Sequence, residues 1–475
     1  MIHLFFDDDL LFGRENVKRV QGTPQYVGAY CQEGYTADMP FNFVFRTDDG
    51  MIRMLYEPRR ISDQQRPLLM AKSEDGIHFE PEDTKALVDL PDRIADNQVF
   101  PLPAPGDEIA DIYDDPMALP GERYKLLLCR TNAQQMRQDT VLFTSPDLYH
   151  WKEKEGVSWG VGNEPLAGVF YNEKQKCNTI LLRPFWGTRR SGYIETRDWK
   201  THTPFQHCMR VDALDEPQAE IYGMNALPYR GMYVGFVQIY HDLQSCYRNK
   251  YWDGRVDVQL AYSYDGRYWQ RGLREFFISN QTWRQEGAKD TKLHWIPRVI
   301  VQKNGDLLLY SATSQKGHGL WDVDRGGGEI RIYRLRKDGF VWMETEDKQS
   351  PSMIRTREKL WHGGDMHINL QAGHATVVVL ESKSEYDYLN NLGGLCKPVE
   401  GFGHEDCIPF AGDSIDWAPQ YKSGRTMEEL KGKTLVFEIC FQDGRLYSLE
   451  GNCTHLSNIE AAHYRTLGDI PETVL

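Results

Sequence analysis

A short turn motif recurs five times along the chain and constrains its fold more than any other feature. The fullest copy is residues 263–269 (SYDGRYW), and apolar segments precede most of the copies. The aspartates of successive copies are 72, 51, 67 and 73 residues apart. A hairpin turn that leads into an aromatic residue at such intervals indicates a repeated supersecondary unit. The other copies are 73–79 (SEDGIHF), 145–151 (SPDLYHW), 196–200 (TRDWK) and 337–342 (KDGFVW).

Five such units predict a five-bladed β-propeller, in which four-stranded blades surround a central channel. The alternative is a large β protein with ordinary hairpins. With 475 residues, the chain is too long for one compact core. The spacing assigns residues 1–347 to a propeller catalytic domain. Apolar segments at 375–380 and 434–439 predict a small C-terminal β-sandwich in residues 348–475.

Charge and cysteine content exclude several classes of protein. The net charge is −14 and no lysine- or arginine-rich run occurs, which argues against nucleic acid and anionic membrane as partners. Nine scattered cysteines without a Cys-x-x-Cys argue against a zinc site and a disulfide framework. The first residues, MIHLFFDDD, do not resemble a signal peptide, and no apolar stretch reaches membrane-spanning length. We therefore expect a cytoplasmic protein.

Four carboxylates are expected at the starts of the innermost strands of successive blades. The side chains at these positions would converge at one mouth of the channel. Glycoside hydrolysis needs one protonated and one ionised carboxyl group, and carboxylates that meet in a cleft push each other's pKa values apart. The alternative is that each is a loop acid or a cap. The four residues are Asp38, Asp115, Glu164 and Glu220.

The stretches Ala37-Asp38 and Asp114-Asp115-Pro116, with an early-strand glutamate in a later blade, resemble glycoside hydrolase families 32 and 43. Those enzymes are five-bladed propellers that act on furanosides or pentosides. The resemblance implies that Asp38 is the nucleophile or base and that Asp115 orients substrate or tunes a pKa. A glutamate would be the general acid: local sequence favours Glu220, and blade order favours Glu164.

The whole chain resembles more closely the uncharacterised bacterial "glycosyl hydrolase-like" proteins of that fold. The matching stretches are residues 4–9, 73–79, 220–224 and 403–407. Two features depart from the families. The Asn-Asp-Pro-Asn signature of family 32 is absent from the first predicted blade, and no arginine precedes Asp114-Asp115-Pro116.

Further polar and aromatic residues are candidates for binding substrate in the channel. Aromatic faces stack on sugar rings, and arginine or histidine donates hydrogen bonds to hydroxyls. Arg183, Arg189 and Arg190 lie within eight residues, and a basic cluster of this kind binds phosphate in the mannoside phosphorylases that this layout resembles. A solvated face is the alternative. The substrate-binding candidates are Arg183, His241, His294, Trp295, Arg298 and His318.

Together these features predict an exo-acting glycoside hydrolase for short oligosaccharides, of the fructose or arabinose furanoside type. No cofactor or catalytic metal is required, while a structural calcium in the channel and a homo-oligomer stay open. The alternatives are a propeller-type glycoside phosphorylase and a non-catalytic propeller that binds glycan.

Overall fold

The structure is a computed structural model in which the chain divides into two compact units. One unit is Thr23–Arg336, and the other is Met1–Gly22 together with Lys337–Leu475. The predicted propeller domain, residues 1–347, therefore differs from the observed unit at both of its ends. The first 22 residues belong to the second unit, and the boundary near the C-terminal end lies between Arg336 and Lys337. The structure describes residues 1–36, 41–63, 65–104, 106–132, 137–159, 168–184, 188–242, 254–279, 289, 292–293, 298–314, 327–382 and 396–470.

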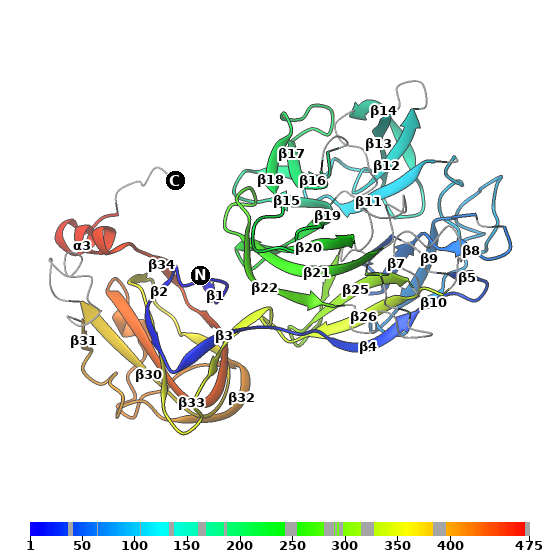
Figure 1. The fold of residues 1–475 in the computed structure, drawn as a ribbon. Coiled ribbons are helices and arrows are strands. Elements are labelled where there is room, and N and C mark those ends of the chain that lie inside the picture. The colour runs from blue at the N-terminus through cyan, green and yellow to red at the C-terminus, as the bar shows by residue number, and fades with distance from the viewer. Residues whose placement is uncertain are drawn as a thin grey trace. The chain divides into compact units, whose positions relative to one another are not determined.

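The unit Thr23–Arg336 is the predicted five-bladed β-propeller (Figure 1). In blades I to IV, four strands follow one another in the sequence and pair antiparallel in that order. Blade I contains β6 (Asn42–Arg46), β7 (Ile52–Tyr56), β9 (Leu69–Ser73) and β10 (Glu80–Pro81); blade II contains β11 (Glu108–Asp114), β12 (Tyr124–Asn132), β13 (Arg137–Ser145) and β14 (Lys152–Trp159); blade III contains β15 (Gly168–Asn172), β16 (Cys177–Leu182), β17 (Ser191–Thr196) and β18 (Gln206–Met209); blade IV contains β19 (Ala219–Tyr229), β20 (Met232–Asp242), β21 (Gly254–Ser263) and β22 (Gln270–Ile278).

Blade V is completed by a strand from the N-terminal part of the chain. Its outermost strand is β4 (Gln25–Tyr30), which pairs with β26 (Ile330–Leu335) across almost the whole propeller sequence. The hydroxyls of Tyr30 on β4 and Tyr56 in blade I lie 3.1 Å apart, so β4 also contacts the neighbouring blade. The other strands of blade V are β23 (Lys292–Leu293), β24 (Val299–Val301) and β25 (Leu307–Ser314), and a separate pair is formed by β5 (Tyr35–Thr36) and β8 (Arg59–Arg60).

Most strands in the middle of the blades are buried on both faces. All eight residues of β25 and nine of the ten residues of β21 are buried or nearly so, and both strands are rich in apolar side chains. Neighbouring blades cover both faces of each sheet, so these strands have near-continuous apolar runs instead of an alternation. This explains why strands, rather than helices, form throughout the unit.

The recurring motif joins the third strand of a blade to its fourth strand in blades I to IV. In the copy at 263–269, the Asp265 carboxylate accepts hydrogen bonds from the backbone N–H of Arg267 and Tyr268, both at 2.8 Å. The Ser263 hydroxyl accepts one from Gly266 N–H at 2.9 Å. Gly266 has a φ of +75°, a conformation that glycine adopts without a steric penalty. The motif is therefore a side-chain-capped turn.

The fifth copy differs from the other four. It follows the third strand of blade V, as expected, but the chain then leaves the propeller. Asp338 has a φ of +58°, which makes it the counterpart of Gly266 and not of the capping Asp265. Its carboxylate accepts a hydrogen bond from the Ser448 hydroxyl at 2.6 Å. The interpretation of 337–342 as a further capped blade turn was wrong.

The second unit corresponds to the predicted small C-terminal β-sandwich. It is β-rich, and its strands form one large sheet that includes the start of the chain. Two long strands organise it, and they contain the segments predicted at 375–380 and 434–439. Residues 442–445 were expected to be a hairpin turn but lie inside the second long strand, where they pair with the first long strand. The strands are β1 (Ile2–Leu4), β2 (Leu11–Glu15), β3 (Val17–Gln21), β27 (Val341–Thr345), β28 (Ser352–Thr356), β29 (Lys359–Trp361), β30 (His367–Ser382), β31 (Cys396–Pro398), β32 (Phe410–Trp417), β33 (Thr434–Glu450) and β34 (Cys453–His455), and the helices are η2 (Met427–Leu430) and α3 (Asn458–Leu467).

The core of this unit surrounds Trp361, whose side chain is fully buried. Its indole N–H donates to Met427 O at 3.0 Å, which satisfies the one polar group of the ring. Across the described residues of both units, no helix has the length and apolar character needed to span a membrane.

Candidate active site

The innermost strands of the blades define the channel and its two mouths. β6 lies beside β11 and β24, and β15 lies beside β11 and β19. The strands β6, β11, β15 and β19 are each the first of their blade, so their starts lie at one end of the propeller, which we call the upper mouth. Their ends lie at the opposite end, which we call the lower mouth. The candidate residues were expected at the upper mouth.

A buried carboxyl group lies at the upper mouth between blades I and II. Glu57 follows β7 directly, and its backbone N–H donates to Phe41 O at 3.0 Å, beside the start of β6. Its side chain is 1% exposed. Arg66 bridges two carboxylates: one guanidinium nitrogen is 3.2 Å from Glu57 Oε2, and another is 3.5 Å from Glu108 Oε1. Burial raises the pKa of Glu57 to about 7; the charge of Glu108 adds to this rise, and that of Arg66 opposes it.

Glu220 lies at the same mouth, at the start of β19, as the sequence predicted. Its carboxylate is in an ion pair with Arg189, whose backbone N–H also lies 3.3 Å from Glu220 Oε1. The Arg189 guanidinium stacks over the ring of Tyr240 at 5.2 Å. Glu220 is 25% exposed, so it is accessible from the solvent while held in one orientation.

His241 is near the upper mouth but is enclosed by protein. It pairs with Ala219 across β19 and β20, and its side chain is 2% exposed. Its Nδ1 is 3.0 Å from Glu216 Oε2, and its Nε2 is 3.1 Å from Asp257 Oδ2. This position between two carboxylates supports a role in holding blade IV together, and leaves substrate binding by His241 a prediction.

Arg183 and Arg298 are both anchored inside the propeller. Arg183 is buried, and its guanidinium donates to Tyr222 O at 3.2 Å. Arg298 precedes β24 and contacts both oxygens of Asp111, at 3.0 and 3.1 Å. Asp111 is fully buried on β11 and also accepts from Val169 N–H at 2.7 Å. Burial raises the pKa of Asp111 to about 6, although Arg298 and the Val169 N–H lower it.

The expected position of Asp115 at the start of an innermost strand was wrong. β11 ends at Asp114, so Asp115 lies at the lower mouth, roughly 20 Å along the strand from the upper mouth. The buried Asp115 carboxylate accepts from the Trp199 indole N–H at 2.7 Å and lies 3.4 Å from both Asn178 Nδ2 and Lys125 Nζ. It ties blade II to blade III, and it is not brought together with Glu220.

The remaining candidates lie outside the described residues. They are Asp38, Glu164, His294, Trp295 and His318. Asp38 precedes β6 and Glu164 precedes β15 in the sequence, and their roles stay predictions. Within the described ranges, no group of three or more His, Cys, Asp or Glu side chains could hold a metal ion. A structural calcium was left open by the sequence and also stays a prediction.

Sequence reasoning missed Glu57, Arg66, Glu108 and Asp111. Glu108 opens β11 and was missed because that strand was expected to follow the segment 111–116. Glu57 directly follows the second strand of its blade, which is antiparallel to β6 and therefore ends where β6 begins. An acidic residue after a second strand was thus an available signal for the upper mouth.

The chain is similar in fold to several solved structures, although no family model and no curated protein matches it. A glycosyl hydrolase from Bacteroides ovatus is 14% identical, with 66% of this chain and 94% of that chain covered and a TM-score of 0.41. A thermostable family-43 glycoside hydrolase is 11% identical, with 68% and 95% covered and a TM-score of 0.41. A third match, 15% identical with 67% and 94% covered and a TM-score of 0.41, comes from the GH130 family of mannoside phosphorylases, described as containing glycoside hydrolases that target beta-1,2 mannosidic linkages in Candida mannan.

Two of these matches are named as glycoside hydrolases, and one of them belongs to family 43, which the sequence resembles. The five-bladed topology of this chain confirms the fold that the resemblance predicted. At 11–15% identity, the function has to be argued from the residues of this chain.

Proposed function

We propose that this protein is a carbohydrate-active enzyme that hydrolyses glycosidic bonds at the upper mouth of its propeller. The observation that carries this proposal is the pair of carboxyl groups in opposite environments, Glu57 and Glu220. Glu57 is buried with a pKa raised to about 7, while Glu220 is partly exposed and paired with Arg189. Titratable groups with such different surroundings are the usual acid and base of an active site.

The chemistry follows from these two states. With a pKa of about 7, a substantial fraction of Glu57 is protonated near neutral pH, and this form would donate its proton to the leaving oxygen of the scissile bond. Glu220, a carboxylate in its ion pair, would stabilise positive charge on the sugar or assist the attacking group. Asp38 keeps its proposed role as nucleophile or base, because it precedes β6 in the sequence. The general acid, for which the local sequence favoured Glu220, is therefore proposed to be Glu57.

The substrate is proposed to be a short oligosaccharide cleaved from one end, of the furanoside type. This finer proposal depends on the resemblance of the Asp38 and Asp115 stretches to families 32 and 43. Asp115 lies at the lower mouth, which removes one basis of the proposed furanoside specificity. The proposed hydrolysis does not depend on Asp115, since it uses the two carboxyl groups at the upper mouth.

The test is a hydrolysis screen of aryl furanosides, aryl pyranosides, fructans and arabinans, with and without phosphate. Wild type is compared with Glu57→Gln, Glu220→Gln and Asp38→Asn, and with Glu74→Gln as a control. Glu74 is exposed in the turn of blade I, and this substitution makes the same change of charge. We expect both Glu57→Gln and Glu220→Gln to lose about 100-fold or more in kcat on natural linkages.

The leaving group separates the two roles. A 2,4-dinitrophenyl leaving group needs no proton, so Glu57→Gln should recover most of its turnover on such a glycoside, and Glu220→Gln should not. Recovery in neither variant would contradict the role of Glu57. Turnover that requires phosphate would identify a phosphorylase. Sugar binding that survives in every variant, with no turnover in wild type, would identify a glycan-binding propeller.

A further inference from the structure

A cavity of about 580 Å³ lies at the outer edge of blade III. It is lined by residues 188–190, which precede β17, and by 207–211, which include the end of β18. Gly168 at the start of β15 pairs with Leu181, and Leu182 pairs with Gly192 at the start of β17. The cavity is therefore at the same end of the propeller as the upper mouth.

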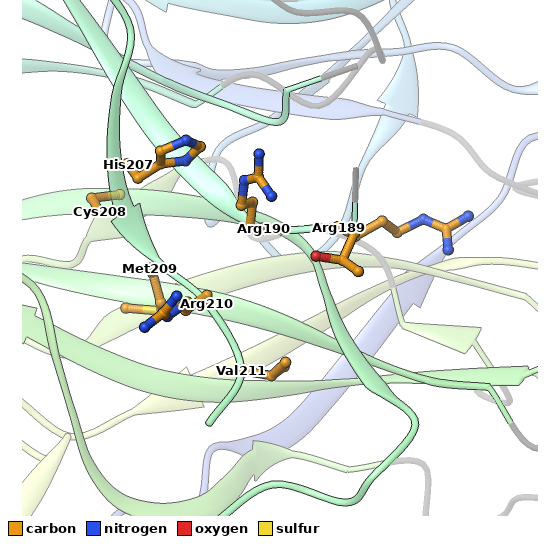
Figure 2. A pocket seen from close by; sticks show the side chains of 8 residues that line it. Arg189, Arg190, His207, Cys208, Met209, Arg210 and Val211 are labelled. Carbon is orange, nitrogen blue, oxygen red and sulfur yellow. The ribbon is translucent and has the colours of Figure 1, made fainter. Parts of the chain in front are cut away.

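One wall of the cavity carries the positively charged Arg190 and Arg210, together with the imidazole of His207. Figure 2 shows the Arg190 guanidinium next to the His207 ring, while the Arg189 side chain extends the opposite way. Burial and the charges of Arg190 and Arg210 lower the pKa of His207. The imidazole therefore experiences a positive potential from both arginines.

Within the part of the chain that the structure describes, no carboxylate forms an ion pair with Arg190 or Arg210. The Nε of Arg190 is buried and has no hydrogen-bond partner. The arginines of the adjacent blade IV behave differently, since Arg271 pairs with Asp215 and Arg274 pairs with Asp212. In a protein with a net charge of −14, a wall of unneutralised guanidinium groups is ready to accept an anionic group.

The rest of the lining suits a sugar ring. Cys208, Met209 and Val211 supply apolar surface beside the charged groups. The volume is within the range of small-molecule sites and far exceeds what a single inorganic ion needs. A ligand with an apolar ring face and one carboxylate would match both parts of the lining.

We propose that this pocket binds the carboxylate of an acidic sugar residue, through Arg190 and Arg210, with the ring on Met209 and Val211. That the ligand is a saccharide depends on the proposed function, whereas the affinity for an anion depends only on the pocket. The bound residue would be part of an oligosaccharide that also reaches the upper mouth.

Arg189 and Arg190 connect the pocket to the candidate active site. The backbone O of Arg189 accepts from Ile221 N–H at 3.4 Å, which fixes this segment beside the start of β19. Arg189 is ion-paired with Glu220, and the next residue, Arg190, lines the pocket. A substrate whose acidic residue binds Arg190 is thereby held next to the strand that presents Glu220.

The first experiment measures binding to the full chain without turnover. Glucuronate and galacturonate are titrated calorimetrically, with glucose and galactose as neutral controls and inorganic phosphate as a free oxyanion. The His207 ring protons are followed by NMR over a pH series. We expect the sugar acids alone to bind well and to raise the pKa of His207, because a bound anion favours the imidazolium.

The variants are Arg190→Ala, Arg210→Ala and the charge-keeping Arg190→Lys. Arg197→Ala is the matched control, since Arg197 is exposed on the same blade, does not line the pocket and donates to Gln175 O. We expect each alanine variant to weaken sugar-acid binding about tenfold or more, Arg190→Lys to weaken it less, and Arg197→Ala to leave it unchanged.

Equal binding of neutral and acidic sugars, unchanged affinity in both alanine variants, or binding of phosphate alone would each overturn the proposal. Because no turnover is measured, its failure is distinct from that of the hydrolase proposal. Hydrolysis of neutral glycosides with no binding of sugar acids would contradict only the pocket, and the reverse result would contradict only the hydrolase.

Discussion

At the scale of single residues, the proposed function depends on how two glutamates at one mouth are surrounded. The Glu57 side chain is buried and shares Arg66 with Glu108. The Glu220 side chain is partly exposed to solvent and is ion-paired with Arg189. The chemistry proposed above needs this difference. It also has a consequence for stability that can be measured before any substrate is known.

The free energy of unfolding should fall as the pH rises from about 4.5 to about 7. In that range, the unfolded Glu57 carboxyl, with an ordinary pKa of about 4.3, has lost its proton, while the folded one, with a pKa of about 7, keeps it. Each unit of pKa difference corresponds to about 1.4 kcal/mol. Glu57→Gln should flatten this slope in urea unfolding curves measured across the range.

Glu74→Gln serves as the control for that experiment, because the exposed Glu74 should leave the slope as in wild type. If the stability curves of Glu57→Gln and wild type run parallel with pH, the raised pKa of Glu57 is contradicted.

The residues that the sequence could not reveal are those whose partners are distant in the chain. Asp111 is stabilised by Arg298, and Glu57 meets Glu108 only through Arg66. Charged residues at every third position of 108–114 concealed a strand. Arg66 and Arg298, from elsewhere in the propeller, contact Glu108 and Asp111, and Arg123 of the same blade pairs with Asp114. Asp115 was therefore assigned to the wrong end of that strand. Glu220 was placed correctly because it opens a long, apolar strand.

At the scale of secondary structure elements, the capped turns show what local sequence can predict. The pattern of serine or threonine, aspartate and aromatic residue forms its hydrogen bonds within a few residues, so four copies were located correctly. The helix α3 has a similar local signal, Ser457 with Glu460 in a capping box, that was overlooked. The fifth copy was interpreted wrongly because the chain passes from the propeller to the second unit there, which the local sequence does not show.

Removing one turn aspartate should destabilise the propeller modestly. Asp265→Ala leaves the backbone N–H groups of Arg267 and Tyr268 without their acceptor, and we expect a loss of about 1 kcal/mol at pH 7, as for other capping residues. Thermal or urea unfolding of the full chain measures it, with the exposed Asp89→Ala as the control.

The pH dependence of that loss has a defined sign. Burial raises the pKa of Asp265, but the N–H groups of Tyr268 and Arg267 lower it overall. A carboxylate with a lowered pKa stabilises the fold above its unfolded value, about 3.9, and this contribution is lost as the pH falls through the folded pKa. The difference between Asp265→Ala and wild type should therefore shrink below about pH 4; a constant difference would contradict the capping role.

At the scale of the whole molecule, the propeller is inserted between the first strands of the second unit and the rest of it. Thr23–Arg336 is continuous in sequence and contains all five blades, including β4. A fragment of residues 23–336 should fold cooperatively, because every blade keeps its strands. Circular dichroism and size-exclusion chromatography test this.

A fragment of residues 32–336 is the matched comparison. It lacks β4, so the edge of β26 has no partner and becomes available for pairing between molecules. We expect this fragment to aggregate or to melt at a clearly lower temperature. If both fragments behave alike, closure of blade V by β4 does not stabilise the propeller.

Because β3 and β27 are far apart in the sequence, the two units are completed at different times during synthesis on the ribosome. β1 to β3 emerge first, but their partners β27, β28 and β33 are made only after the whole of Thr23–Arg336. At the usual speed of translation, the early strands wait roughly 15–60 s for them. The propeller can close during that time, so it would be finished while the second unit is still incomplete.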